Sequence, residues 1–361
     1  MKKTIFTILC ILLILCGCKK GGEKQTVATT VETEPAVIAT TEATQPPTTA
    51  PTEPPEEHFT LTFVGDCTLG SAPMHYEMAT GFIKTVGEDY AYPFANVAEY
   101  FQNDDYTMIN LEGVFADEGY PADKLFTFRG PSSYINILTQ NSVDGVTLSN
   151  NHTLDYYQAG YNSTKEILDE AGIPYVERDS SRMFTTESGL TIGMYAATFT
   201  VDMEDLTAEV AAMRENGAEV VIFAPHWGKE CYYYPLTHLE EYARGAIDAG
   251  VDIVVGHHPH VLQRMEEYNG GVIFYSLGNF SFGGNLQPTD LDSVLVQQEY
   301  IRDAEGNIRR GELTVVPMCI SSAPPVNNFQ PTPYEEGSEE YQRVMDKLGG
   351  LWDGIALPVD Y

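Results

Sequence analysis

The sequence has few basic residues. It contains 20 lysines and arginines against 52 aspartates and glutamates, which gives a formal net charge of −32. A chain this acidic excludes nucleic acid and anionic membrane surfaces as general partners, because their phosphate groups repel it. An anionic substrate would therefore need locally placed cations or metal ions.

Cysteine is also scarce, with six residues in 361. Three of the six lie within the first eighteen residues, and the other three are Cys67, Cys231 and Cys319. An odd and widely spaced trio excludes a disulfide framework for the remainder of the chain.

The N-terminal apolar run, residues 5–15, lacks the length of a membrane-spanning helix and has that of a signal peptide. It follows Lys2 and Lys3, and after it Leu15-Cys16-Gly17-Cys18 resembles the lipobox of bacterial lipoproteins. The sequence therefore predicts a signal peptide over residues 1–17, a lipid on Cys18 and anchoring at the extracytoplasmic face of the cell membrane. An ordinary secretory signal is the alternative.

Residues 24–57 consist almost entirely of threonine, proline, glutamate, alanine and valine. Such a segment cannot bury enough apolar surface to offset the entropy lost on ordering, and its prolines favour extended conformers. We expect residues 18–57 to form a disordered linker that carries the next domain away from the membrane. An unstructured tail without a spacing role is the alternative.

Residues 58–320 show the alternation of strands and helices that is typical of one large α/β domain. Short apolar runs predict strands at 59–64, 106–111, 143–148, 219–225 and 251–255. Periodic stretches predict helices at 94–102, 157–171, 203–216 and 236–249. After residue 260, segments 272–277, 293–302 and 312–318 resemble an antiparallel meander that forms a second sheet. Residues 321–361 are expected to form a peripheral tail with one helix near 341–348.

Polar residues that can bind metals follow each of the first five strands. They are Asp66, Glu112, Asn151 with His152, His226, and the segment Gly256-His257-His258-Pro259-His260. Because loops at the carboxyl ends of parallel strands meet at one edge of a sheet, we expect these five strand ends to converge. A His-X-His pair on an extended segment also places both imidazoles on one side.

These residue types together predict a hydrolytic metal centre. Carboxylates, an amide oxygen and imidazoles provide the mixed ligands that Mn, Zn, Fe or Mg ions take. Two ions that share a carboxylate could activate a bound water. Taken singly, each residue has a structural explanation: Asp66 could cap a helix, and His226 could be a hydrogen-bonded core histidine.

The motifs in this order resemble the CapA family of poly-γ-glutamate capsule biosynthesis proteins, from about residue 59 to about residue 318. The Asn150-Asn151-His152 and His258-Pro259-His260 motifs are the most specific part of the resemblance. That family is in turn similar to calcineurin-like metallophosphoesterases. The resemblance implies a four-layer α/β/β/α sandwich with mixed sheets over residues 58–320.

The resemblance also implies roles for individual residues. Glu112 takes the place of the carboxylate that bridges two divalent ions (Mn, Zn or Fe), and His152 takes that of the proton donor to the leaving group. One ion would be held by Asp66 and His260, the other by Asn151, His226 and His258. Thr68 stands where the phosphoesterases have a histidine ligand, so the first site is weak, empty, or completed by Cys67 or Asp155.

Arg129 is one of few basic residues in the domain, and a guanidinium can clamp a carboxylate or phosphate of the substrate. A structural salt bridge is the alternative. The expected partner is an anionic polymer such as poly-γ-glutamate, or a cell-wall fragment, cleaved at an amide or phosphoester bond. The second hypothesis is a non-catalytic accessory subunit that docks to a membrane synthase or exporter.

Overall fold

The computed structural model describes residues 55–352. The signal sequence, Cys18 and nearly all of the expected linker lie outside the described residues. Within residues 55–352, no helix is long and apolar enough to cross a membrane.

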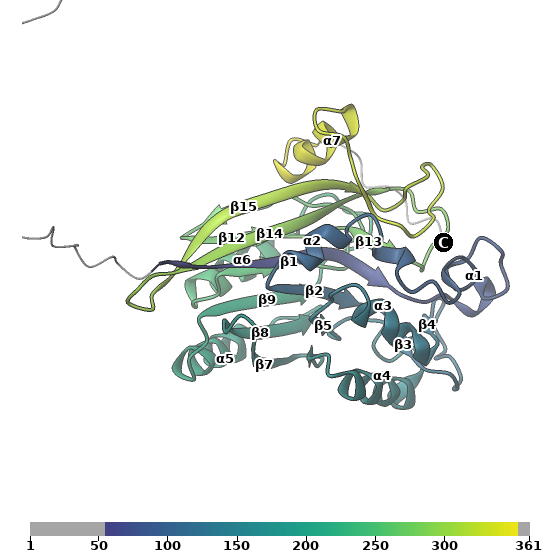
Figure 1. Cartoon of the computed structure of the whole chain (residues 1–361), viewed down its shortest axis with the longest axis horizontal. Helices are drawn as coiled ribbons and strands as arrows, with labels where there is room; N and C mark the ends of the chain where they lie inside the picture. The colour runs from purple at the N-terminus through teal and green to yellow at the C-terminus, as the bar shows by residue number, and fades with distance from the viewer. Residues whose placement is uncertain (1–54, 353–361) are drawn as a thin grey trace, which may run out of the picture. The chain divides into compact units, whose positions relative to one another are not determined.

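Two mixed β-sheets stack face to face (Figure 1). The eight-stranded sheet has the order β16-β15-β14-β1-β2-β5-β6, with β13 paired in parallel to the end of β1. Its strands are β1 (Glu57–Thr68), β2 (Tyr106–Leu111), β5 (Gly145–Thr147), β6 (Tyr175–Val176), β13 (Asn279–Phe282), β14 (Asp292–Arg302), β15 (Ile308–Cys319) and β16 (Thr332–Pro333).

The six-stranded sheet has the order β11-β12-β10-β9-β8-β7, and its four central strands are parallel. Its strands are β7 (Ser180–Thr185), β8 (Thr191–Thr198), β9 (Val220–His226), β10 (Ile253–Val255), β11 (Met265–Tyr268) and β12 (Gly271–Phe274). A separate parallel pair, β3 (Val114–Phe115) and β4 (Arg129–Gly130), lies beyond β2.

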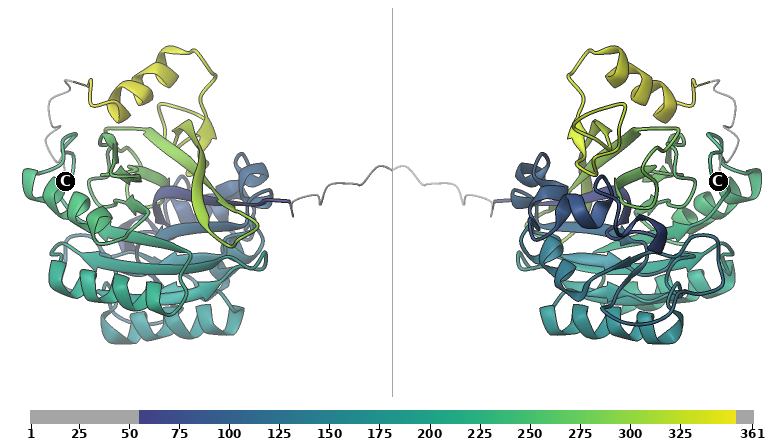
Figure 2. Two further views of the ribbon diagram at one scale, coloured as in Figure 1. Left: turned by 90° about the vertical axis from the view of Figure 1, so that its left-hand side faces the viewer. Right: turned by 90° about the vertical axis from the view of Figure 1, so that its right-hand side faces the viewer.

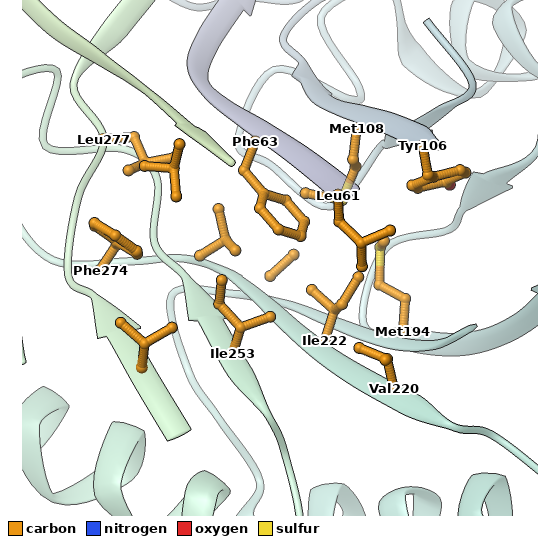
Figure 3. Packing of buried hydrophobic residues seen from close by; sticks show 14 of the residues in the cluster. Leu61, Phe63, Tyr106, Met108, Met194, Val220, Ile222, Ile253, Phe274 and Leu277 are labelled. Carbon is orange, nitrogen blue, oxygen red and sulfur yellow. The ribbon is translucent and has the colours of Figure 1, made fainter. Parts of the chain in front are cut away.

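The alternation of side chains along each strand builds the core between the sheets (Figure 3). Leu61 and Phe63 of β1 face Ile222 of β9 in this inner core, whereas Val64 and Phe223 belong to the outer clusters. All five side chains are fully buried, and each such burial stabilises the fold by about 1.5–3 kcal/mol.

Helices cover the outer face of each sheet and complete the expected four-layer α/β/β/α sandwich. Helices α1 (Phe82–Val86), α2 (Ala98–Gln102), α3 (Ile135–Thr139) and α4 (Tyr157–Ala171) pack on the eight-stranded sheet, and α5 (Met203–Glu215) and α6 (Thr237–Asp248) on the other. Single 3-10 turns occupy Pro73–His75, Tyr92–Phe94 and Ser132–Tyr134. Helix α4 ends at Gly172, which adopts the left-handed conformation expected of a stop residue.

The strands are divided between the sheets differently from the expectation. Strands β1, β2 and β5 belong to the eight-stranded sheet and β9 and β10 to the six-stranded one, so the five strand ends do not share one sheet. The expected meander is also split, because β14 and β15 extend from β1 whereas β12 pairs with β10. Strands β9, β10 and β12 are almost entirely apolar and buried on both faces, so their pattern cannot assign them to a sheet.

The C-terminal segment packs onto the domain and is not the peripheral tail that its composition suggests. Helix α7 (Glu339–Leu348) lies on β14 and β15 (Figure 2) and buries Val344. Lys347 is only 4% exposed, and its Nζ lies 2.6 Å from Asp290 Oδ2 and 2.7 Å from Asp292 Oδ2. Removing one partner of such a buried ion pair costs about 3–5 kcal/mol.

Candidate metal centre

Loops from both sheets meet at one place, where the carboxyl ends of their strands lie side by side. Asp66 near the end of β1 is in register with Asn279 of β13. His226, the last residue of β9, forms a parallel bridge with His257 in the loop after β10. The site therefore lies across the junction of the two sheets, where His257 of one sheet contacts Asp66 of the other.

The carboxylate of Asp66 is fully buried and surrounded by donors. Its Oδ1 accepts a hydrogen bond from Asn110 Nδ2 and lies 2.9 Å from His257 Nδ1. Its Oδ2 accepts from the backbone N–H of His258 and lies 3.2 Å from His260 Nδ1. Burial opposes ionisation, but the hydrogen bonds with His257 and His260 hold the pKa of Asp66 well below its usual value.

Glu112 is a second buried carboxylate, and it lacks comparable support. Its Oε2 accepts a hydrogen bond from the Thr68 hydroxyl at 3.1 Å, but Oε1 has no hydrogen-bond partner among residues 55–352. Burial and the charge of Asp66 raise the pKa of Glu112 to about 8. Asp66, Glu112 and His226 each offer a ligand atom within 4.8 Å of the others, so a cation would relieve the repulsion.

His226 and His258 lie beside Glu112 with their ring centroids 4.8 Å apart. His226 Nε2 is 2.8 Å from Asn151 Oδ1 and 3.4 Å from Glu112 Oε1. Burial lowers the pKa of both histidines, that of His258 to about 4, so both are neutral at physiological pH. The Nδ1 atom of His258 is buried without a hydrogen-bond partner in the described chain, as expected of an imidazole whose lone pair is meant for a metal.

The His258-Pro259-His260 segment bends, although an extended conformation was expected. His258 and His260 have φ angles of 96° and 57°, a region that costs a non-glycine residue about 1–3 kcal/mol. Their ring centroids nevertheless lie 5.9 Å apart, so the bend keeps both imidazoles at the site. Strain of this kind collects at functional sites because the surrounding structure maintains it.

His260 provides the positive charge that the two carboxylates need in the metal-free protein. Its Nδ1 lies 2.9 Å from Asn279 Oδ1 and also contacts Asp66. Burial opposes protonation of His260, but the charges of Glu112 and Asp66 outweigh it and raise its pKa to about 10. An imidazolium here occupies the electrostatic role of a metal ion, which shows that the residues fit a cation.

His152 lies next to this centre and is oriented by a buried carboxylate. Its Nδ1 is 2.7 Å from Asp155 Oδ2, and the other oxygen of Asp155 is 2.5 Å from Lys124 Nζ. The ring packs 4.4 Å from that of Phe128, and burial lowers the pKa of His152. Holding Nδ1 in this way fixes the tautomer and leaves Nε2 for contact with a substrate.

A cavity of about 510 Å³ opens beside the centre. Its wall includes His152 and His260, the carboxylates of Glu230 and Asp290, and several aromatic rings such as Phe282. No lysine or arginine is among the described residues that line it. An anionic group in this cavity would therefore depend on metal ions or imidazoles for its positive partner.

Arg129 lies outside the residues that line the cavity. Its guanidinium stacks over the rings of Tyr76 and Tyr156, at 5.5 and 4.8 Å from their centroids. These cation–π contacts give Arg129 a structural partner, and its role as a substrate clamp stays a prediction.

The structure thus brings together all six residues that the sequence suggested as metal ligands: Asp66, Glu112, Asn151, His226, His258 and His260. Further polar residues surround these six, namely Asn110, Asn150, His257, Asn279 and Glu230. Asn150 ties the site together, because it donates to Asn110 Oδ1 and accepts from the backbone N–H of His152. Adjacency to the predicted ligands was a signal for Asn110, Asn150 and His257.

The chain is similar to several known proteins. Residues 60–284 match the model of the family described as "Bacterial capsule synthesis protein PGA_cap". The chain is 30% identical to the PGA biosynthesis protein CapA of Bacillus subtilis (strain 168) over 323 residues, 81% of this chain and 78% of that protein. It is 29% identical to the capsule biosynthesis protein CapA of Bacillus anthracis over 298 residues, 74% of this chain and 69% of that protein.

More distant similarities also exist. A probable polyglutamine synthesis accessory protein of Mycobacterium tuberculosis (strain H37Rv) is 26% identical over 227 residues, 53% of this chain and 60% of that protein. Among solved structures, the NAD nucleotidase of Haemophilus influenzae aligns with 82% of this chain and 63% of its own, at 12% identity and a TM-score of 0.41.

The raised pKa values predict proton release when a metal binds. At pH 7 the metal-free protein holds a proton on Glu112 (pKa about 8) and on His260 (pKa about 10), and ligation removes both. Calorimetric titration with Mn²⁺ in buffers of different ionisation enthalpy should detect the released protons. Fewer protons should be released at pH 9, where Glu112 is already ionised. Glu112→Gln should release fewer protons than the unsubstituted protein at pH 7, because the substituted side chain carries none to lose. Equal release at both pH values from the unsubstituted protein would contradict this account.

Proposed function

This chain belongs to the bacterial capsule synthesis protein family, and we propose that it acts in the synthesis or processing of poly-γ-glutamate or a related cell-wall polymer. We further propose that it is a metal-dependent hydrolase that cleaves an amide or phosphoester bond of that polymer. The observation that carries the hydrolase proposal is the pair of buried carboxylates, Asp66 and Glu112, with neutral imidazoles beside them and a cavity in front.

The residues present support the chemistry of a divalent ion. Asp66, Glu112, Asn151, His226, His258 and His260 would hold the metal, as the orphaned oxygen of Glu112 and the orphaned nitrogen of His258 suggest. When bound there, Mn, Zn or Fe ions lower the pKa of a coordinated water and polarise an oxygen of the substrate.

His152 is suited to move a proton at the leaving group. Its Nε2 is directed away from Asp155, and the residue lines the cavity in which the scissile bond would lie. A proton on Nε2 would pass to the departing nitrogen or oxygen while Asp155 stabilises the imidazolium. The pKa of His152 lies below its usual value, so its acid form is populated below neutral pH and decreases as the pH rises.

The cavity is suited to a segment of an anionic chain that carries methylene groups. Its aromatic residues Phe126, Phe128 and Phe282 would contact aliphatic parts of the polymer. Glu230, a carboxylate in its wall, would repel free acids unless a metal ion is bound beside it, whereas Asp290 is already paired with Lys347. We therefore infer that the polymer enters the cavity only in the metal-loaded protein.

Substitution of His152 by asparagine tests the catalytic proposal. The Mn²⁺-loaded protein should release fragments from poly-γ-glutamate, muropeptides or aryl phosphates, and His152→Asn should slow this about 10²–10⁴-fold through loss of proton transfer. Bound metal should not change, because His152 is not among the proposed ligands. His238→Asn, on the exposed face of α6, is the matched control. The absence of any released product from the loaded, unsubstituted protein would refute the hydrolase.

A non-catalytic accessory role is the second candidate, and Thr68 favours it. Thr68 donates to Glu112 where a phosphoesterase histidine would bind metal, so one ligand is missing. The protein would then guide the polymer as a subunit of a membrane synthase or exporter. In a strain that lacks the gene, His152→Asn would fully restore polymer export under this alternative and would fail to do so under the hydrolase proposal.

We propose that Cys18 carries the lipid that holds the domain at the outer face of the membrane. The lipobox-like Leu15-Cys16-Gly17-Cys18 segment supports this, and residues 18–57 would set the reach of the domain. Cys18→Ser should move the protein from the membrane fraction into the medium or periplasm, as followed by immunoblotting of cell fractions. Cys16→Ser, two residues earlier, should leave it in the membrane. Retention of the Cys18→Ser protein in the membrane would argue against lipid anchoring through this residue.

A further inference from the structure

The loop that follows β9 lies alongside the histidine-rich loop that follows β10. The backbone N–H of Trp227 donates to the carbonyl of His257 at 3.0 Å, and that of Cys231 donates to the carbonyl of Pro259 at 2.8 Å. Between these two hydrogen bonds the first loop turns sharply at Gly228, whose φ is 90°. The two bonds fix the position of the intervening residues, including Glu230, against the second loop.

Glu230 lies close to two of the proposed metal ligands. Glu230, His258 and His260 each offer a ligand atom, and these three atoms lie within 4.8 Å of one another. That spacing is slightly more than twice a metal–ligand bond of about 2.0–2.2 Å, so small side-chain movements suffice to reach one ion. Glu230 and His260 also line the cavity, which places this cluster at its wall.

Each histidine of this cluster has a ring nitrogen that is available to bind a metal ion. His260 Nδ1 is engaged by Asn279 and Asp66, which leaves its Nε2 for a ligand on the other side. His258 Nδ1 is buried without a hydrogen-bond partner in the described chain.

Cys67 and Asp155, the other residues that could replace the missing ligand at Thr68, lie in different surroundings. Cys67 packs in the outer core against the helices, and its Sγ contacts the carbonyl oxygen of Gly65. Asp155 is fully buried, and its two oxygens bind His152, Lys124 and the backbone N–H of Phe128. Neither side chain belongs to a described cluster of metal-binding atoms.

We propose that Glu230 is a metal ligand, and that with His258 and His260 it holds an outer divalent ion at the wall of the cavity. An inner ion would be held by Asp66, Glu112 and His226, whose ligand atoms form a second cluster. The outer ion replaces the site that Thr68 cannot complete, with a carboxylate from the loop after β9 in place of the histidine from the end of β1. Three protein ligands leave open coordination positions towards the cavity, as in catalytic sites. This proposal deepens the metal-dependent part of the proposed function.

The test is a count of bound Mn²⁺ in the full-length protein and in its Glu230→Gln variant. Equilibrium dialysis followed by atomic emission should give two ions per unsubstituted chain. The variant should keep one ion at unchanged affinity and bind the other at least about tenfold more weakly, because it loses a charged ligand. Glu241→Gln, an exposed residue of α6, is the matched control and should behave as the unsubstituted protein.

A second variant keeps the result interpretable. His226→Gln should weaken binding of the inner ion, so the two variants should reduce the Mn²⁺ affinity of different sites. Thermal unfolding of each metal-free variant shows whether it folds. Two ions bound by Glu230→Gln with unchanged affinities would overturn the proposal, as would loss of both ions from a folded variant. This test measures only bound Mn²⁺. If the protein binds two ions but releases nothing from the polymers, the hydrolase proposal is refuted while the assignment of Glu230 as a ligand stands.

Discussion

Two carboxylates, Asp66 and Glu112, are buried side by side at the junction of the sheets, and much of the surrounding structure serves to make this tolerable. Asp66 remains ionised because two imidazoles, an amide and a backbone N–H surround it. Glu112 has no such support, and its pKa rises to about 8. In the metal-free protein the imidazolium of His260 balances the charge of Asp66. A divalent ion would do so with two charges, which is why we place metal there.

The four-layer fold explains how so polar a centre can be buried. The core between the sheets and the clusters under the helices are apolar, and the proposed ligands lie where strands end. Parallel strands from both sheets bring those ends to the same place, and the hydrogen bonds of Asp66 with His257 and His258 join the sheets there. The strained conformations of His258 and His260 are maintained by hydrogen bonds to Asp66 and Asn279. The site is therefore rigid before any ligand arrives.

The sequence predicts well those features whose signals are local. Strand β2 and helix α4 begin and end where expected, because β2 is a bounded apolar run and Gly172 stops α4. The sequence pattern did not predict strand β8, because Gly193 and the two alanines of this segment interrupt its β-branched residues. The six ligands could be suggested from the sequence because each lies in a motif at a strand end. Glu230 was missed because its role depends on which loops lie side by side, and spacing along the chain does not reveal that.

The central claim is that the convergence of the two sheets builds a centre for divalent metal. It is tested most directly by crystals grown with Mn²⁺ and measured at a wavelength where manganese scatters anomalously. The account predicts one anomalous peak among Asp66, Glu112 and His226, and a second among Glu230, His258 and His260. The absence of a peak at both places, in a protein whose fold is otherwise that described, would contradict it.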